Sequence, residues 1–364
     1  MIRSIRIRGF KRFVDSQFDF KRLTVLAGLN GTGKTSLIHA LLLAREALGG
    51  GTAVRLNGPF GLELGTAQDV RNWETDGDLS LTMVSDESPP AEWRFGVVSD
   101  EALFLKRVAT PDEPPIAFSP LPRSFTYLCA ERLGPRNVLG AAALPTDSLG
   151  VGVRGDFCAQ VLTAMGDRPL MDDARLHPDT GPNDALLVKY QVERWLSEIV
   201  RPVELDAEHY PGTSTTALRF RAPGGDWVRA PNMGFGVSYA LPVVLGGLVA
   251  ACGGLLLVEN PEAHLHPAGQ SRMGGFLAWL SACGVQVVLE THSDHVLNGI
   301  RRAIGEHHHL RASDAVVHSF EAEDSLRVST LRFTETGGLS DWPSGFFDQY
   351  QIDVAALGRV RRRR

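Results

Sequence analysis

Cysteine is scarce in this sequence, with only four residues among 364. They lie far apart and form no Cys-x-x-Cys pair, which argues against a zinc cluster and against a disulfide framework. Cysteine use of this kind is typical of a reducing compartment, so we expect a cytoplasmic protein. The four are Cys129, Cys158, Cys252 and Cys283.

Sustained heptads and internal repeats are also missing, which excludes long coiled-coil arms and solenoid folds. One uncharged stretch, residues 237–258, is long enough to span a bilayer. Pro242 and two Gly-Gly pairs interrupt it, and no basic residues flank it closely. We therefore predict a buried helix, a glycine turn and a buried strand there, and no contact with a membrane.

Positive charge is not in excess, because the formal net charge is -5. This balance argues against wholesale coating of nucleic acid. A local basic patch nevertheless lies near the N-terminus; it predicts a contact with DNA or RNA, and the alternative is ordinary solvated charge. The patch consists of Arg3, Arg6, Arg8 and Lys11. The arginine run at residues 361–364 we interpret as solvated charge.

The most specific motif is Gly-Leu-Asn-Gly-Thr-Gly-Lys-Thr at residues 28–35, which fits Gly-x-x-x-x-Gly-Lys-Thr without a mismatch. A β-prone run precedes it, and apolar residues at helical spacing follow it, which an ordinary glycine-rich turn would not require. Its glycines let backbone N–H groups close around phosphates, Lys34 neutralises phosphate oxygens, and Thr35 offers a hydroxyl to Mg2+. The predicted nucleotide contacts are Asn30, Gly31, Thr32, Gly33, Lys34, Thr35 and Ser36.

Two further apolar strands end in polar residues that suit the same site. Residues 255–258 are followed by Glu259, which we predict to hold the magnesium shell. Residues 285–289 are followed by Glu-Thr-His-Ser, which places His292 where it would sense a γ-phosphate. A lone histidine there is more often structural. The order of P-loop, acidic strand end and Thr-His-Ser favours the functional interpretation.

With these motifs in this order, the chain resembles the ABC-type ATPase heads of the SMC-like, RecF-like and OLD proteins over nearly its whole length. The resemblance includes the first strand and turn at residues 5–13, the Walker A form with Asn30, and a signature at residues 234–238. It continues through the Walker B segment at residues 259–267 and the switch histidine, His292. Residues 341–348 are similar to the tail of stand-alone bacterial ATPases that carry a domain of unknown function.

The resemblance implies an α/β P-loop NTPase of the ABC-ATPase head type, without a coiled coil. Its two lobes would be a mixed α/β nucleotide lobe with an antiparallel β subsheet, and a helical lobe. The implied divisions are residues 1–125 for the first part of the nucleotide lobe, 126–230 for the helical lobe, 231–335 for the second part of the nucleotide lobe, and 336–364 for a C-terminal tail.

The resemblance also implies a homodimer, or a larger homo-oligomer, that sandwiches ATP and Mg2+. Each site would combine one protomer's P-loop with the other protomer's signature, in which Gly234, Gly236 and Ser238 approach a phosphate. The alternative for this segment is a glycine-rich loop that only begins a core helix. Further implied contacts are Lys11 or Arg12 with the nucleotide, and Gln68 with the metal.

One departure from the family pattern concerns catalysis. Glu259 and Asn260 stand where the family usually has Asp and Glu, and an amide cannot act as a base. Glu262 could orient the attacking water, or Asn260 could position it without taking a proton. We therefore expect a slow ATPase that controls a separate effector, a nuclease or toxin, in nucleic-acid transactions or phage defence. The alternatives are a non-hydrolysing nucleotide-gated scaffold and a P-loop small-molecule phosphotransferase.

The middle of the chain is less specific. Residues 79–83, 93–98 and 102–108 alternate like antiparallel strands, and residues 125–129 form another strand. Helices are predicted at residues 156–165 and 183–200, the second capped by Asn183 or Asp184. Arg132 either lies near the nucleotide or a partner, or forms an ordinary ion pair.

Overall fold

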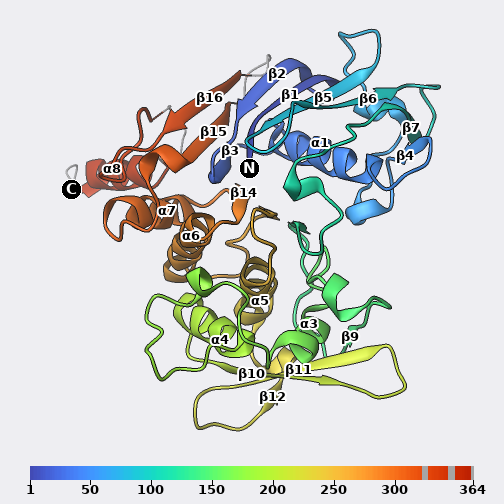
Figure 1. The fold of residues 1–364 in the computed structure, drawn as a ribbon. Coiled ribbons are helices and arrows are strands. Elements are labelled where there is room, and N and C mark those ends of the chain that lie inside the picture. The colour runs from blue at the N-terminus through green and yellow to red at the C-terminus, as the bar shows by residue number, and fades with distance from the viewer. Residues whose placement is uncertain (322–326, 343–348, 362–364) are drawn as a thin grey trace.

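The computed structural model describes residues 1–321, 327–342 and 349–361. Three sheets organise this part of the chain (Figure 1). The N-terminal sheet contains β1 (Ile2–Phe10), β2 (Phe13–Asp19), β4 (Ala53–Arg55), β5 (Leu79–Ser85), β6 (Ala91–Gly96) and β7 (Phe104–Ala109). The core sheet contains β3 (Leu23–Gly28), β8 (Phe125–Leu128), β13 (Leu255–Glu259), β14 (Gln286–Glu290), β15 (Ala315–Glu321) and β16 (Arg327–Arg332). The third contains β9 (Leu139–Gly140), β10 (Glu204–His209), β11 (Thr215–Arg221) and β12 (Val228–Arg229).

Helices cover both faces of the core sheet, with α1 (Lys34–Ala47) on one face and α5 (Phe235–Leu248), α6 (Pro267–Ala282) and α7 (Asp294–Gly305) on the other. The remaining helices are α2 (Ala67–Val70), α3 (Cys158–Met165), α4 (Val188–Ile199) and α8 (Gln349–Arg361). Strand side chains alternate between the faces. Leu255 and Leu257 therefore join the core around α1, whereas Leu256 and Val258 join the core of α5, α6 and α7.

The strand order of the core sheet is β16-β15-β3-β14-β13-β8. All neighbours are parallel except the β15 and β16 pair. In the register of the sheet, Glu290 pairs with Leu26 on one side and with Glu259 on the other. The strand that carries Glu290 therefore lies between the P-loop strand and the strand that carries Glu259. The carboxyl ends of all three strands meet at one edge, where α/β sheets bind ligands.

Helices α6 and α7 approach each other closely through two glycines. A Cβ atom at Gly299 would collide with the carbonyl oxygen of Ser271, and one at Gly274 would collide with that of Val296. Because both positions tolerate only hydrogen, the backbone of α7 lies directly against α6. This contact fixes α7, which begins immediately after the Thr-His-Ser segment.

The N-terminal sheet confirms the predicted antiparallel strands, with β5 paired to β6 and β6 paired to β7. The third of these strands begins at Phe104, two residues later than expected. The uncharged stretch is also confirmed as the buried helix α5, a turn and the buried strand β13. Within the described residues, every helix is too short or too polar to cross a bilayer.

The predicted helical lobe, residues 126–230, which we call the lower lobe, differs from the prediction in two respects. Helix α4 begins at Val188, and its N-cap is Leu187, so the predicted cap at Asn183 or Asp184 is wrong. The carboxylate of Asp184 accepts hydrogen bonds from the Gly181 N–H and the Arg194 guanidinium, and so stabilises the turn before the helix. The segment predicted to be helical also carries β9 to β12, whose short and polar strands gave no clear alternation.

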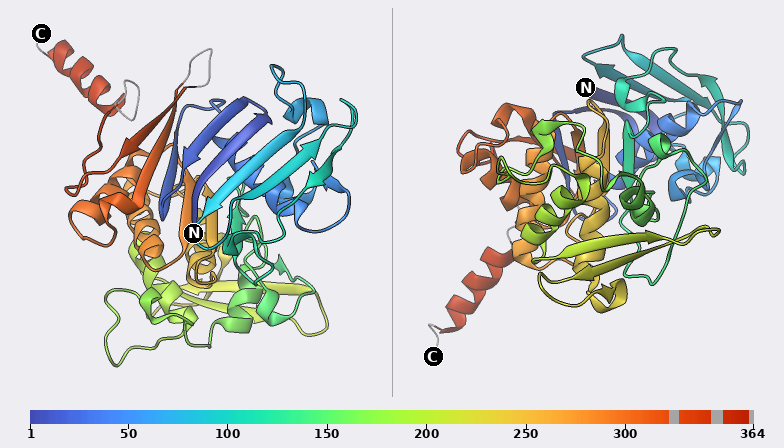
Figure 2. Two further views of the ribbon diagram at one scale, coloured as in Figure 1. Left: turned by 45° about the horizontal axis from the view of Figure 1, so that its top comes forward. Right: turned by 60° about the horizontal axis from the view of Figure 1, so that its bottom comes forward.

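Helix α8 projects away from the rest of the molecule (Figure 2). Residues 343–348, which contain most of the predicted tail motif, lie outside the described residues, as do the terminal arginines at 362–364.

Candidate nucleotide-binding site

The P-loop connects β3 to α1 with three glycines in the left-handed region of backbone space. Their φ angles are 131° at Gly28, 77° at Gly31 and 112° at Gly33. A Cβ atom at Gly28 would collide with the carbonyl oxygen of Phe320 on β15, whereas Gly31 faces open space. The loop thus combines a closely packed base with an open tip, which suits the close approach of phosphate groups to backbone N–H groups.

Lys34 lies inside this loop. Its Nζ donates hydrogen bonds to the carbonyl oxygens of Gly28, at 3.0 Å, and Leu29, at 2.6 Å. The side chain is 2% exposed, and burial lowers the pKa of its ammonium group. The loop itself therefore holds the lysine charge, next to the place where phosphates would bind.

Two carboxylates lie at the edge of the core sheet, and they have different partners. Glu259 accepts hydrogen bonds from the Tyr127 hydroxyl at 2.9 Å and from the Ala130 N–H at 3.1 Å. Glu290 instead accepts a hydrogen bond from the Thr35 hydroxyl at 3.1 Å, and one of its oxygens lies 3.7 Å from Nζ of Lys34. The structure therefore joins Glu290, rather than Glu259, to the P-loop.

Sequence reasoning missed Glu290. The signal was present, because a carboxylate at the end of an apolar strand was the same feature that selected Glu259. Strand order decides between them, and strand order is set by pairing between segments far apart in the chain. Burial raises the pKa of Glu290 to about 7, and the charge of Glu259 adds to this effect.

The residues at this edge suit a nucleotide with Mg2+. The Thr35 hydroxyl and the Glu290 carboxylate are hard oxygen donors of the kind that Mg2+ prefers. Asn260 lies nearby, since its N–H donates a hydrogen bond to the carbonyl oxygen of Glu290 at 2.8 Å, and its side-chain oxygen is buried without a hydrogen-bond partner in the described structure. Such an atom is costly unless a ligand or water satisfies it. Mg2+ would here neutralise phosphate charge during phosphoryl transfer.

The segment after β14, residues 291–293, forms hydrogen bonds with Glu262, and we call it the switch segment. The two carboxylate oxygens of Glu262 accept hydrogen bonds from the Thr291 hydroxyl at 2.8 Å and from the His292 N–H at 2.9 Å. The hydroxyl of Ser293 then caps α7 by accepting from the Val296 N–H. Glu262 therefore positions the switch segment with both of its oxygens. Burial and the nearby charge of Lys34 lower the pKa of His292, whose Nε2 lies 3.8 Å from Glu290.

The signature segment lies at the start of α5. Gly234 has a φ of 98° and precedes the helix, and Phe235 is 53% exposed. The Phe235 ring stacks on His264 with centroids 5.0 Å apart. Gly236 and Ser238 lie in the first turn and are partly exposed. Among the described residues, no hydrogen bond or ring contact joins this segment to the P-loop of the same chain.

The adjacent basic residues Lys11 and Arg12 point to different places. Arg12 donates a hydrogen bond to the carbonyl oxygen of Gly31 at 2.8 Å, so it reaches the tip of the P-loop. Lys11 has a φ of 48°, and its Nζ lies 2.9 Å from Nδ1 of His39 on α1. Gln68 is exposed on α2, and its backbone N–H donates to Asp100. Its predicted metal contact stays a prediction.

Comparisons with known proteins agree with this geometry. Residues 171–298 match a family described as "AAA domain, putative AbiEii toxin, Type IV TA system". Residues 4–62 match an AAA domain, and residues 310–357 match a protein of unknown function (DUF3696). Two segments of the chain thus match AAA domains, and together with the fold they support an SMC-like AAA ATPase head. The resemblance predicted from the motifs, including the tail, is thereby confirmed.

Solved structures confirm the predicted head fold. An Smc head bound to the C-terminal winged-helix domain of ScpA is 14% identical, with a TM-score of 0.52 over 91% of this chain and 97% of that chain. An Smc head from Pyrococcus furiosus, with an extended coiled coil and the C-terminal domain of ScpA, is 11% identical, with a TM-score of 0.52 over 99% of both chains. At these identities the likeness concerns the fold alone. No curated protein gave a significant match.

Arg132 holds the end of β13 in this ATPase head. Its guanidinium donates hydrogen bonds to the carbonyl oxygens of Cys129 at 3.1 Å, Glu259 at 2.7 Å and Asn260 at 2.6 Å. The residue is 1% exposed. Its partners are therefore backbone carbonyls rather than the carboxylate of an ordinary ion pair. The predicted closeness of Arg132 to the nucleotide or a partner stays a prediction. Asn260 has a φ of 44°, and this positive value makes the turn that exposes its carbonyl to Arg132.

The basic strand of the ATPase head is largely neutralised by acidic neighbours. Arg6 and Arg8 both bond to Asp15, and Arg3 bonds to Asp86 at 2.5 Å. The two arginines lower the pKa of Asp15 to about 2. A nucleic acid would have to compete with these carboxylates for the arginines, so its predicted contact stays a prediction.

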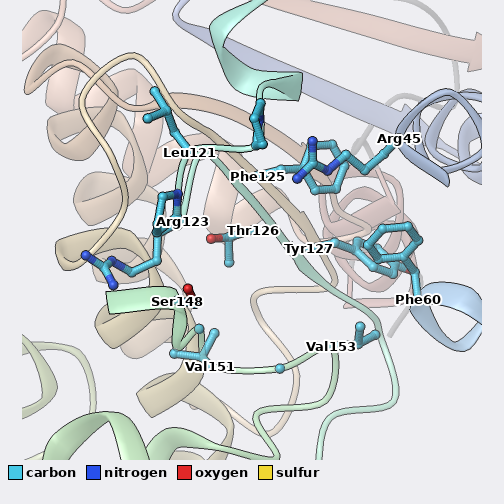
Figure 3. Close-up of a pocket in the computed structure, with 14 residues that line it drawn as sticks. Arg45, Phe60, Leu121, Arg123, Phe125, Thr126, Tyr127, Ser148, Val151 and Val153 are labelled. Carbon is cyan, nitrogen blue, oxygen red and sulfur yellow. The ribbon is translucent and has the colours of Figure 1, made fainter. Parts of the chain in front are cut away.

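A cavity of about 330 Å³ lies beside β8, one strand beyond Glu259 (Figure 3). Tyr127 lines it together with Phe60 and Phe125, while the Tyr127 hydroxyl bonds to Glu259. Its two arginines are already engaged: Arg45 donates to backbone carbonyls at residues 118 and 119, and Arg123 donates to those at residues 147 and 249. This cavity is therefore distinct from the P-loop site.

The raised pKa of Glu290 predicts a pH effect on the nucleotide-free ATPase head. The pKa of the Glu290 carboxyl is raised from its ordinary value of 4.5 to about 7. Between pH 4.5 and about pH 7, the folded protein therefore binds the carboxyl proton more tightly than the unfolded chain does. Raising the pH through that window should therefore lower the free energy of unfolding, by on the order of 2 kcal/mol. Glu290→Gln should remove this part of the decrease. Urea unfolding on both sides of the window measures it, and equal decreases in both proteins would contradict the prediction.

Proposed function

We propose that the protein binds ATP with Mg2+ and hydrolyses it slowly, as a dimer in which each nucleotide lies between two protomers. The observation that carries the proposal is the division of the site. The P-loop, Lys34, Thr35 and Glu290 lie together on one protomer. The signature helix begins at an exposed Gly234 and Phe235 instead. Its N-terminal dipole would therefore meet the phosphates of a nucleotide held by another protomer.

The proposed slow rate follows from the residues near the attacking water. Asn260 cannot accept a proton, and both oxygens of Glu262 already hold the switch segment. Phosphoryl transfer depends mainly on positioning and charge stabilisation, so an amide that orients water still supports turnover. The unpartnered oxygen of Asn260 suits that role. A nucleotide-gated scaffold that does not hydrolyse ATP is the second candidate, favoured by the same amide.

We further propose that ATP-dependent closure controls a separate effector protein. The solved Smc heads are bound to a domain of ScpA, and one matched family carries the description "AAA domain, putative AbiEii toxin, Type IV TA system". Both descriptions support a head that acts on or through another protein. Purification of the chain with the products of neighbouring genes tests this part, and nuclease or toxin activity that depends on ATP is the expected result.

A mixing experiment tests the composite site. Lys34→Ala disables the P-loop, and Ser238→Glu places a negative charge at the signature, where it repels phosphate but suits the first turn of a helix. Each variant alone should be inactive. An equal mixture should recover about a quarter of wild-type ATPase activity, because half of the dimers are mixed and each mixed dimer has one intact site of two. No recovery from two folded variants would contradict the composite site, whereas recovery would exclude the scaffold.

A further inference from the structure

The edge of the core sheet presents two buried carboxylates in adjacent register, yet only one faces the P-loop. Glu259 and Glu290 pair across β13 and β14. They are 9% and 6% exposed. Strand β14 pairs directly with the P-loop strand β3, whereas β13 is one strand further away. Equivalent side chains on these two strands therefore lie at different distances from a nucleotide in the P-loop.

The side chain of Glu259 bonds to residues of β8 and the segment after it, on the side of β13 away from the P-loop strand. One of its oxygens accepts from the Tyr127 hydroxyl on β8, and the other accepts from the Ala130 N–H just after β8. Its own carbonyl oxygen accepts from Arg132. These bonds tie the ends of β8 and β13 together. A metal ion that bound Glu259 would have to replace bonds that close this edge of the sheet.

Glu290 has the opposite set of partners. Its two oxygens lie 3.1 and 3.4 Å from the Thr35 hydroxyl, and one of them lies 3.7 Å from Nζ of Lys34. Thr35 and Lys34 are the P-loop residues that serve the metal and the phosphates. The three groups converge from β14 and the first turn of α1, without any contribution from β13.

We propose that Glu290 is the protein carboxylate that binds Mg2+ together with Thr35, and that Glu259 is a positioning residue for the β8 and β13 edge. The proposal rests on the proposed binding of ATP with Mg2+. Without the metal, the Thr35 hydroxyl donates a hydrogen bond to Glu290; with the metal, both oxygens become available to the cation. Because β14 ends at Glu290, two residues before His292, metal binding there would also affect the switch segment.

Equilibrium binding of a fluorescent ATP analogue tests this assignment. Affinity is measured in excess EDTA and across a Mg2+ titration, for wild type, Glu290→Gln and Glu259→Gln. For Glu290→Gln we expect the Mg2+ concentration at half effect to rise at least about tenfold, while binding in EDTA persists because one negative charge near the phosphates is gone. Glu259→Gln is the matched variant, one strand away, and should keep a Mg2+ response close to that of the wild type.

The outcomes distinguish the assignment of the Mg2+ ligand from the proposed binding of ATP. Loss of the Mg2+ response in Glu259→Gln but not in Glu290→Gln would overturn the assignment while leaving ATP binding intact. Loss in both variants, or in neither, would also overturn it. A folded wild type that bound no nucleotide in either buffer would overturn the proposed function itself. If circular dichroism shows that Glu290→Gln does not fold, Glu290→Asp and Glu259→Asp give the same comparison. Aspartate keeps the charge, and its side chain is one methylene shorter, so the carboxylate no longer reaches the same position.

Discussion

Replacing Lys34 by alanine weakens ATP binding by about 1.5–3 kcal/mol, which is roughly 10- to 150-fold. The reason is the loss of charged hydrogen bonds to phosphate oxygens at a buried position. Nζ of Lys34 donates to the carbonyl oxygens of Gly28 and Leu29, so the ammonium group lies inside the loop. Isothermal titration calorimetry measures the change directly.

Lys189→Ala is the matched control for this experiment. That lysine lies on α4 in the lower lobe, 3.8 Å from Asp206, and its side chain is 27% exposed. Its removal should leave ATP affinity within about twofold of the wild type, because exposed ion pairs contribute little. An equal loss of affinity in both variants would show that the Lys34 result reflects general damage rather than a phosphate contact.

Replacing Arg132 by methionine lowers the free energy of unfolding by about 3–5 kcal/mol, because three carbonyl oxygens in a buried environment lose their donor. These belong to Cys129, Glu259 and Asn260, so the loss falls on the end of β13. Denaturant unfolding followed by circular dichroism measures the change.

Arg154→Met provides the comparison for Arg132. Arg154 is 41% exposed and pairs with Glu131, which is 84% exposed. Its loss should cost less than about 1 kcal/mol. Similar costs for the two substitutions would mean that the carbonyl bonds of Arg132 are satisfied in another way after its removal.

The parts of the fold that could be predicted from the sequence are those that depend on residues contiguous in the chain. The P-loop needs one strand, one turn and one helix in succession, and all of its chemistry lies within nine residues. The three antiparallel strands of the N-terminal sheet alternate regularly because one of their faces is buried. Helix α4 was misplaced at its start because Asp184 stabilises a preceding turn, and turn and cap residues share the same chemistry.

The parts that could not be predicted depend on contacts between distant segments. Arg132 bonds to residues about 130 positions further along the chain, and nothing near it in the sequence indicates that partner. Glu290 and Glu259 look alike at their strand ends, and only the insertion of β14 beside β3 separates them. Lys11 and Arg12 are neighbours, and the positive φ of Lys11 directs one to α1 and leaves the other at the P-loop.

In the proposed dimer, the two hydrogen bonds from Glu262 to the switch segment would connect the two nucleotide sites. His264 lies two residues beyond Glu262 and packs against Phe235, on the exposed start of the signature helix. A second protomer that pressed on this surface would displace the turn containing Glu262, and that turn is bonded to Thr291 and His292. In the proposed dimer, contact with a partner at Phe235 would therefore reach the segment that carries His292 through this turn.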